Sequence, residues 1–186
     1  MRLDAMIILA VIFLLGVMIF YLPVFFVLKK KGKGGLRQLS YLLFLWSFLL
    51  ILFVTLTPIT FSPEQYHLNL RPFLWLEGGN VNRIELMESV GNVLMFIPLG
   101  FLLPAVFKKV RKIYLLAGVI FIITFSIEFI QYFMGRIADI DDVLENFLGG
   151  IIGYGIFTAF NKLLQSRRWW SRFIGMSSEG KMKEKN

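Results

Sequence analysis

The sequence predicts an all-α fold: a polytopic membrane helix bundle with five transmembrane helices. Of its 186 residues, 57% are hydrophobic, and the mean hydropathy is +0.71, whereas soluble domains are about 45–50% apolar. Five apolar runs are long enough, or nearly so, to cross about 30 Å of hydrocarbon at about 1.5 Å per residue. Lysines and arginines cluster between these runs, which is typical of membrane topology.

The predicted spans follow one another along most of the chain. They cover residues 5–28, 39–57, 90–107, 113–133 and 143–164. The third run is short, but Asn82 and Glu85 have the spacing of a capping box, so its helix is expected to begin near Arg83. Pro98 and Pro104 lie inside this span, and a kink is expected at Pro98 because proline removes a backbone donor.

The distribution of positive charge predicts the orientation of the bundle. Sixteen lysines and arginines fall in the segments on one side of the spans and four in the segments on the other side. By the positive-inside rule, the N-terminus faces out and the C-terminus faces the cytoplasm. Residues 1–38 then form a transmembrane anchor with a basic inner loop, and residues 165–186 form a basic cytoplasmic tail. Trp169 and Trp170 in this tail are expected at the membrane interface.

Composition also excludes several classes of function. The net charge of +8 does not indicate nucleic-acid binding, because the basic residues flank the apolar runs instead of forming a basic groove. The chain has no cysteine, so disulfides and thiolate metal sites are excluded. The one histidine, His67, is expected to be an ordinary loop residue. No serine, cysteine or histidine pattern indicates nucleophilic catalysis, so no catalytic residue is predicted.

Polar side chains gather where the fourth span ends and the fifth begins, just under the predicted outer surface. Glu128 and Gln131 share a helical face, and Glu88 and Asn92 reach the same depth from the third span. A carboxylate at membrane depth is by default a functional group. With two arginines of the outer connections, the predicted ligand-binding residues are Arg71, Glu88, Asn92, Glu128, Gln131, Arg136, Asp139, Asp142 and Asn146.

Two kinds of ligand fit this polar cluster. The N-termini of the third and fifth helices, together with the two arginines, could receive an anion such as a lipid phosphate. The carboxylates could instead hold a divalent cation, which would bridge to such a phosphate. The sequence does not choose between them, and no other cofactor is expected. Arg136 and Asp139 could also form a simple surface ion pair.

Some residues of this region have spacings that indicate a structural role in place of ligand binding. Asp142 and Glu145 have the spacing of a capping box, which predicts that they begin the fifth helix. Gly149 and Gly153 are spaced to form a close-packing face between helices, which is a better interpretation than a ligand-binding loop.

Several motifs occur together in the second half of the chain. They are Asn69-Leu70-Arg71-Pro72-Phe73, GNVLMFIPLG at 91–100, Glu128-Phe129-Ile130-Gln131, GRIADIDD at 135–142, and Asn146 with Gly149, Gly150 and Gly153. In these motifs and their order the chain resembles the VanZ-like family of bacterial membrane proteins. The resemblance covers about residues 69–160, and the first two spans and the tail lie outside it.

The resemblance implies a multi-pass protein of the bacterial plasma membrane, with residues 39–164 as a VanZ-like bundle. It further implies reduced susceptibility to lipoglycopeptide antibiotics such as teicoplanin. These drugs bind cell-wall precursors outside the membrane, which agrees with an outward-facing site.

Three functions are therefore considered. The leading hypothesis is a non-enzymatic protein that binds an envelope lipid or a lipid-linked cell-wall precursor at the outer-leaflet polar cluster. The second is a membrane enzyme or transporter acting on a phosphate-bearing lipid. The third is a structural membrane subunit in which the polar cluster locks helices together. The sequence predicts no oligomeric state.

Overall fold

The computed structural model of the chain describes residues 3–32, 34–56, 68–73 and 83–176. Among these residues, five helices are long and apolar enough to cross a membrane, so the predicted helix bundle is confirmed. The elements in chain order are α1 (Leu3–Lys30), α2 (Gly35–Leu56), β1 (Leu68–Asn69), α3 (Arg83–Val106), the 3-10 helix η2 (Lys108–Arg111), α4 (Ile113–Phe133), β2 (Ala138–Asp139), α5 (Ile140–Leu164) and α6 (Arg168–Phe173).

Most predicted helix ends agree with the structure. The bounds of α4 equal those of the predicted fourth span, and α3 begins at Arg83, with both prolines inside it. In contrast, α2 begins at Gly35, so the predicted boundary between residues 38 and 39 falls within a helix. Asn82, His67 and the tail beyond Met176 lie outside the described residues.

The predicted start of α5 is wrong. The helix begins at Ile140, and its N-cap is Asp139, whose side chain accepts a hydrogen bond from the backbone N–H of Asp141. Asp142 therefore lies in the first turn and does not cap the helix with Glu145. An aspartate is a favoured N-cap because its carboxylate satisfies an unpaired N–H of the first turn.

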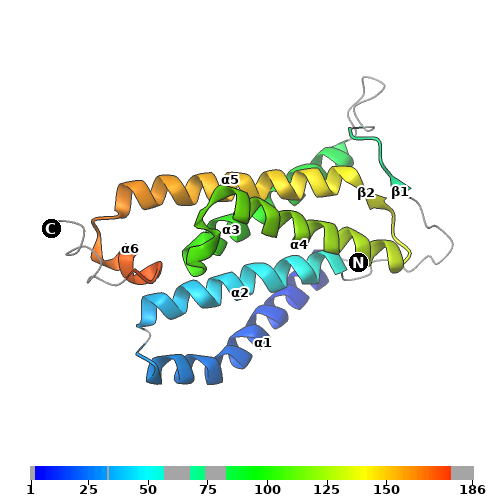
Figure 1. Cartoon of the computed structure of the whole chain (residues 1–186). Coiled ribbons are helices and arrows are strands. Elements are labelled where there is room, and N and C mark those ends of the chain that lie inside the picture. Colours follow the sequence, from blue (N-terminus) through cyan, green and yellow to red (C-terminus); the bar gives the residue numbers. More distant parts are fainter. Residues whose placement is uncertain (1–2, 33, 57–67, 74–82, 177–186) are drawn as a thin grey trace.

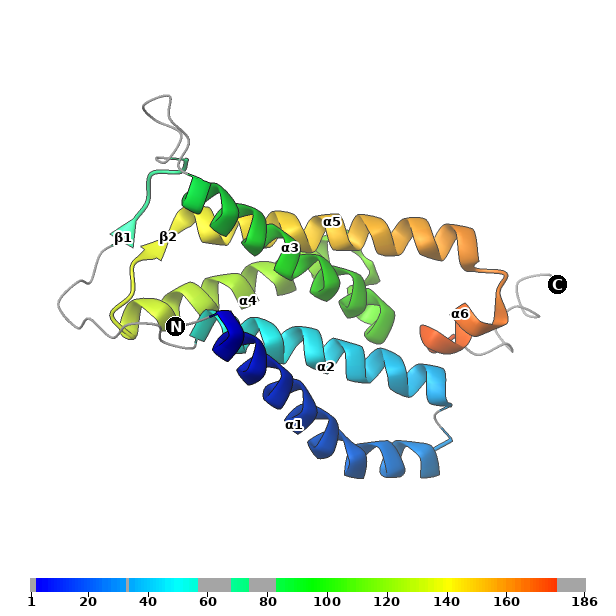
Figure 2. The ribbon, with the colours of Figure 1, turned by 180° about the vertical axis from the view of Figure 1, so that it is seen from behind.

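The helices alternate in direction. α1, α3 and α5 run one way along the bundle, and α2 and α4 run back (Figure 1). α3 and α5 form the most extensive interface, α4 packs on α5, and α2 packs on α3. α1 lies at the edge of the bundle beside α2, as Figure 2 shows from behind. The central core consists of Ile51, Phe96, Leu99, Leu103, Leu116, Ile120 and Ile127.

Glycines allow the close approach of α3 and α5. A Cβ atom added at Gly149 would overlap the carbonyl oxygen of Val93, and one added at Gly153 would overlap the carbonyl oxygen of Ile97. Both obstacles are backbone atoms, which cannot rotate away as a side chain can. The two glycines thus pack helix against helix, in the way that small residues do in membrane bundles.

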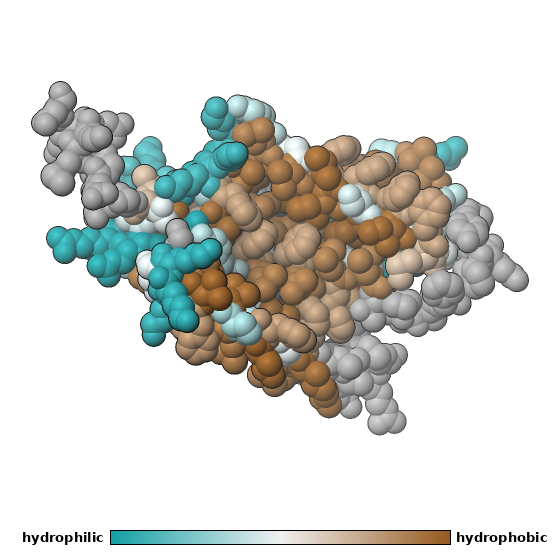
Figure 3. Space-filling model, turned by 60° about the horizontal axis from the view of Figure 1, so that its bottom comes forward, coloured by the Kyte–Doolittle hydropathy of each residue, from teal (hydrophilic) through white to brown (hydrophobic). Residues whose placement is uncertain are grey.

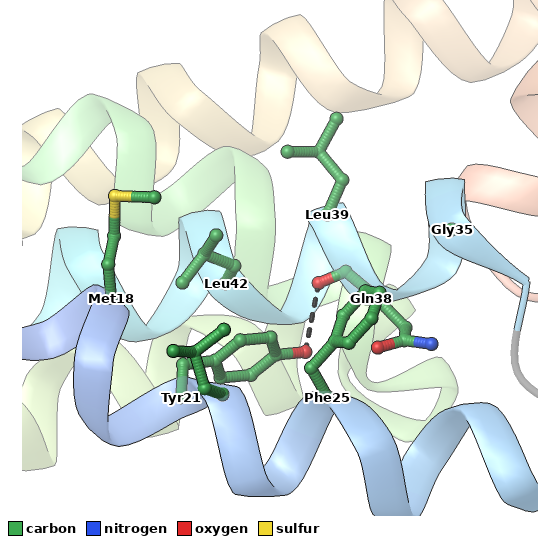
Figure 4. Close-up of a pocket in the computed structure, with 8 residues that line it drawn as sticks. Met18, Tyr21, Phe25, Gly35, Gln38, Leu39 and Leu42 are labelled. Atoms are coloured by element: carbon green, nitrogen blue, oxygen red, sulfur yellow. Dashed lines mark hydrogen bonds between the residues drawn. The ribbon is translucent and has the colours of Figure 1, made fainter.

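The contact between α1 and α2 is looser. The Tyr21 hydroxyl donates to the carbonyl oxygen of Gln38 at 3.1 Å. Beside this bond lies a largely apolar cavity of about 310 Å³, lined by residues of both helices including Met18, Phe25 and Leu42 (Figure 4). α1 is therefore a peripheral helix that contributes little to the central core.

The two ends of the bundle differ in charge. We call one the basic end: it comprises the end of α1, the start of α2, η2, α6 and the end of α5. Hydrophilic residues gather where α1 ends, next to a broad hydrophobic surface (Figure 3). The charged residues described at the basic end are all basic: Lys29, Lys30, Lys31, Arg37, Lys108, Lys109, Arg111, Lys112, Lys162, Arg167, Arg168 and Arg172.

Arg37 closes the basic end. Its side chain is buried, and the guanidinium donates to the carbonyl oxygens of Ala105 at 2.7 Å, Val106 at 2.6 Å and Phe173 at 3.1 Å. It thereby joins α2 to the end of α3 and to α6. Burial, followed by the nearby charge of Arg37, lowers the pKa of Arg111, which also donates to backbone carbonyls of this end.

α6 packs inside this end of the protein. Trp170 is 2% exposed, lies among aromatic rings including Phe157 and Phe173, and donates from Nε1 to Oδ1 of Asn161 at 3.0 Å. Trp169 is half exposed. Trp170 therefore fills a pocket within the protein, and the position of this tail at the membrane interface stays a prediction.

Candidate functional site

The opposite end of the bundle, which we call the acidic end, is organised around Asp139. β1 and β2 pair in parallel, with Asn69 opposite Asp139. The Asn69 side chain donates from Nδ2 to Oδ2 of Asp139 at 2.9 Å, while Oδ1 of Asp139 caps α5. The backbone N–H of Asp139 donates to Oε2 of Glu128 at 3.2 Å. One residue thus connects β1, α4 and α5.

Asp141 holds the segment that follows β1. Both oxygens of its carboxylate accept from the backbone N–H of Phe73, at 2.9 and 3.0 Å. Phe73 has a φ of 60°, in the left-handed region that non-glycine residues seldom adopt. This contact fixes residues 68–73 against the first turn of α5.

A second group of polar side chains joins α3, α4 and α5. Asn92 donates from Nδ2 to Asp142 at 2.7 Å and to Glu145 at 3.1 Å. Asn146, which is 2% exposed, donates to the Thr124 hydroxyl at 3.3 Å, and its Oδ1 has no hydrogen-bond partner in the described part of the chain. The bonds of Asn92 cross the α3–α5 interface that the glycines bring together, and the bond of Asn146 crosses the interface of α4 and α5.

Gln131 and Arg136 donate hydrogen bonds to the backbone at the end of α2. Nε2 of Gln131 and Nη1 of Arg136 both donate to the carbonyl oxygen of Thr55, at 2.9 and 2.7 Å. A helix leaves its last carbonyls without intrahelical partners, so these side chains satisfy one of them. The guanidinium of Arg136 therefore donates to the backbone of α2. The expected ion pair would instead have joined it to Asp139.

A cavity of about 500 Å³, which we call the acidic pocket, opens beside this network. Every charged residue in its lining is a carboxylate. The lining consists of Asn69, Glu85, Glu88, Ser89, Ile137, Asp139, Asp141, Asp142 and Glu145.

A groove of about 520 Å³, which we call the aromatic groove, runs along α4 on the other side of Asp139. Four of its phenylalanines recur at every fourth position of α4, and the ring centroids of successive pairs are 6.1, 6.4 and 4.8 Å apart. Its charged residues are Glu128 and Asp139. The lining is Leu68, Leu70, Phe121, Phe125, Glu128, Phe129, Tyr132, Phe133, Ala138, Asp139, Ile140 and Val143.

The structure brings together only part of the predicted ligand-binding set. Glu88, Asp139 and Asp142 line the acidic pocket, and Glu128 and Asp139 line the aromatic groove. Asn92 supports two of the carboxylates from α3. The remaining predicted residues line neither cavity: they are Arg71, Gln131, Arg136 and Asn146.

Sequence reasoning missed Asn69, Glu85 and Asp141 as parts of this region. It also missed the row of phenylalanines on α4 that lines the groove, which we call the aromatic wall. The wall had a visible signal, since phenylalanines at every fourth residue from Phe121 to Phe133 share one helical face. No sequence pattern indicated the role of Asp141, because its partner is the backbone of a residue 68 positions away.

The electrostatics of the acidic end disfavour direct binding of an anion at α5. Asp139 and Asp141 already place carboxylates at the N-terminus of this helix, where an external anion would otherwise bind. A cationic group is the better electrostatic match for the acidic pocket. Among the described residues, no group of three or more histidine, cysteine, aspartate or glutamate side chains is arranged to hold a metal ion.

Comparison with known proteins decides the family. The family model described as VanZ/LLP1 matches residues 7–161. The chain belongs to the VanZ/LLP1 family. It is 31% identical over 140 residues to Protein VanZ of Enterococcus faecium, an alignment that covers 75% of this chain and 81% of the Enterococcus protein. No solved structure matches the chain.

The VanZ/LLP1 match confirms the resemblance and extends it. The motifs that carry the resemblance begin at residue 69, whereas the match also includes most of α1 and all of α2. With its five apolar helices, this VanZ/LLP1 protein is a membrane protein. Both cavities of the acidic end lie wholly within the matched residues.

Proposed function

We propose that this protein binds an envelope lipid or a lipid-linked cell-wall precursor at its acidic end, on the outer side of the bacterial plasma membrane. The consequence would be reduced susceptibility to lipoglycopeptides such as teicoplanin. The observation that carries the proposal is that Asp139 lines both cavities, so a polar pocket and an apolar groove meet at one residue. Such a pair of cavities fits an amphiphile, with its head in the pocket and a hydrocarbon chain in the groove.

The exposed rings of the groove support this arrangement. Phe125 is 54% exposed and Phe129 is 55% exposed, and in a bilayer these rings would meet hydrocarbon. Covering apolar surface contributes about 25 cal/mol for each Å² only where it displaces water. In a bilayer the lipid chain would displace other hydrocarbon, so this contribution is small and specificity would have to come from the polar head group.

The charge of the two ends supports the outward orientation. The basic end carries lysines and arginines without a described acidic residue, and the acidic end carries most of the described carboxylates. The positive-inside rule then assigns the basic end to the cytoplasm and both cavities to the outer leaflet. Lipoglycopeptides act on that side of the membrane, so a bound precursor or lipid there could alter their access to the surface.

A structural role is the second candidate, and the hydrogen bonds between helices favour it. Asn92, Gln131 and Asn146 each bond to another helix, and such bonds contribute about 0.6 kcal/mol on average in membrane proteins. In this case the polar cluster would be needed for folding and for nothing else.

A comparison of matched variants separates the two candidates. A teicoplanin-susceptible bacterium would express the wild type, Glu128→Gln, Asp139→Asn and the control Ser126→Ala. Ser126 is exposed on α4, bonds to its own helix and lines neither cavity. The measurements are teicoplanin susceptibility, the amount of folded protein in the membrane, and co-purifying lipid by native mass spectrometry.

We expect both carboxylate variants to lose the drug phenotype and the bound lipid while the amount of folded protein stays the same. Ser126→Ala should behave as wild type. A fall in folded protein alone would favour the structural role. Retention of both the phenotype and the lipid would show that these residues do not form the site.

A further inference from the structure

The charge of the two cavities restricts the head group that they can accept. The aromatic groove is lined by two charged residues, and both are acidic. Together with the acidic pocket, which opens on the other side of Asp139, the lining holds seven carboxylates and no lysine or arginine: Glu85, Glu88, Glu128, Asp139, Asp141, Asp142 and Glu145.

Within the described part of the chain, the hydrogen-bond partners of these carboxylates bring no positive charge. The hydrogen bonds that they accept come from neutral groups, namely the amides of Asn69 and Asn92 and the backbone N–H groups of Phe73, Asp139 and Asp141. Neutral donors satisfy the oxygens but add no positive charge.

The guanidinium of Arg136 acts on Glu128 and Asp142 through its charge but donates its hydrogen bond to Thr55. Arg136 offers one positive charge to these two carboxylates, which also repel each other, and buried carboxylates without a counter-charge are unfavourable. A cationic ligand would supply what is missing.

The aromatic wall adds a second feature that suits a cation. Glu128 is 5% exposed and lines the groove together with Phe125, Phe129 and Tyr132. Aromatic faces attract ammonium groups through their quadrupole, most strongly where water is excluded. The groove therefore combines a buried carboxylate with aromatic rings, and from Glu128 toward Phe121 the α4 residues in its lining are phenylalanines.

We infer that the occupant of the aromatic groove is a membrane lipid whose head group carries an ammonium ion, held at Glu128 and Asp139 with its hydrocarbon chain along the phenylalanines of α4. This inference rests on the proposed lipid-binding function and deepens it by naming the chemistry of the head group. For a lipid whose head is purely anionic, the charged residues that line the groove are all carboxylates.

The test is a native mass spectrometry titration of the full chain, purified in detergent. The probes are phosphatidylethanolamine and phosphatidylglycerol with identical acyl chains, each with and without EDTA. We expect phosphatidylethanolamine to bind about tenfold more tightly, which corresponds to about 1.4 kcal/mol. Glu128→Gln should reduce this preference to about twofold or less, and Ser126→Ala should keep it.

Because Glu128 and Asp139 also hold β2, a second variant guards against misfolding. Glu85 and Glu88 are exposed and line the acidic pocket, so the double variant Glu85→Gln, Glu88→Gln should fold normally. We expect it to weaken the preference for the ammonium lipid by about two- to fivefold, because it removes charge near the head group without touching the groove.

Other outcomes would overturn the inference. Equal binding of the two lipids, or tighter binding of phosphatidylglycerol, would show that the head group is not selected by positive charge. Phosphatidylglycerol binding that EDTA abolishes would show that a divalent cation, and not an ammonium group, meets the carboxylates. In these cases lipid binding, and with it the proposed function, would stand. If neither lipid binds, the proposed lipid-binding function fails together with the inference.

Discussion

The carboxylate of Asp141 accepts the backbone N–H of Phe73 with both of its oxygens, at 2.9 and 3.0 Å, across 68 positions of sequence. Phe73 adopts a φ of 60°, which costs a non-glycine residue about 1–2 kcal/mol. The contact therefore balances a strained turn with a charge-assisted hydrogen bond. It also holds β1 beside β2, so the walls of both cavities depend on it.

Replacing Asp141 tests this dependence. In Asp141→Ala the N–H of Phe73 loses its acceptor, and we expect the contact to weaken by about 1–3 kcal/mol. Amide hydrogen exchange of residues 69–73 should then accelerate about tenfold or more, since each 1.4 kcal/mol is a factor of about ten. Ser89→Ala, in the same pocket lining, is the control. Unchanged exchange in Asp141→Ala would show that other contacts hold the turn.

The glycine interface offers a prediction about stability. In Gly153→Ala the new methyl group would overlap backbone atoms of α3, including the carbonyl oxygen of Ile97. Because backbone cannot give way locally, α3 and α5 must separate, and we expect a loss of about 1–3 kcal/mol. The measurement is the thermal unfolding midpoint of the protein in detergent, followed by size-exclusion chromatography of heated samples.

Gly155→Ala is the matched control for that experiment. It lies on the same helix, and a Cβ atom there meets nothing within 4 Å. Alanine also has a higher helix propensity than glycine, so this variant should be neutral or slightly stabilising. Similar midpoints for the two variants would contradict the close packing at Gly153.

The spans could be predicted because they depend on local composition. α4 begins after a basic cluster and ends before Gly135, and its predicted bounds were correct. The predicted start of α5 was wrong because its cap, Asp139, is positioned by β1, which is distant in sequence, and by Glu128 of the preceding helix. The burial of Arg37 was not predictable either, since its acceptors are carbonyls of α3 and α6.

The depth of the candidate site residues along their helices could be predicted from the sequence, but their hydrogen-bond partners could not. Helical depth placed Glu88, Asn92 and Glu128 at one level, and in the structure Glu88 and Glu128 line cavities at the acidic end while Asn92 bonds to carboxylates there. The same argument could not show that Gln131 and Arg136 bond to Thr55, because nothing local links residues 76 and 81 positions apart. The depth of a residue along its helix follows from its position in the sequence. Which group becomes its hydrogen-bond partner depends on how the helices pack.

Arg37 gives a prediction about the basic end. In Arg37→Gln the carbonyls of Ala105, Val106 and Phe173 lose a charged donor, and each such bond contributes about 1.5–3 kcal/mol. We expect α6 to detach more often, so that trypsin cleaves after Arg167 or Arg168 at least about tenfold faster. The measurement is a time course of limited proteolysis in detergent.

Lys30→Gln is the control for proteolysis. It removes one positive charge from the same end, but Lys30 is exposed at the end of α1. Its cleavage rate near α6 should match the wild type. Equal rates in Arg37→Gln and Lys30→Gln would show that Trp170 and its aromatic neighbours hold α6 without Arg37.

The orientation of the bundle can be measured directly because the chain has no cysteine. Leu70→Cys lies in the exposed segment after β1, and Lys109→Cys lies in the exposed η2 helix at the basic end. If the basic end faces the cytoplasm, a membrane-impermeant maleimide added to intact cells should label Leu70→Cys and not Lys109→Cys. After the cells are broken open, both variants should be labelled. The reverse pattern in intact cells would place both cavities on the cytoplasmic side, where a lipid-binding site could not act on drugs at the outer surface.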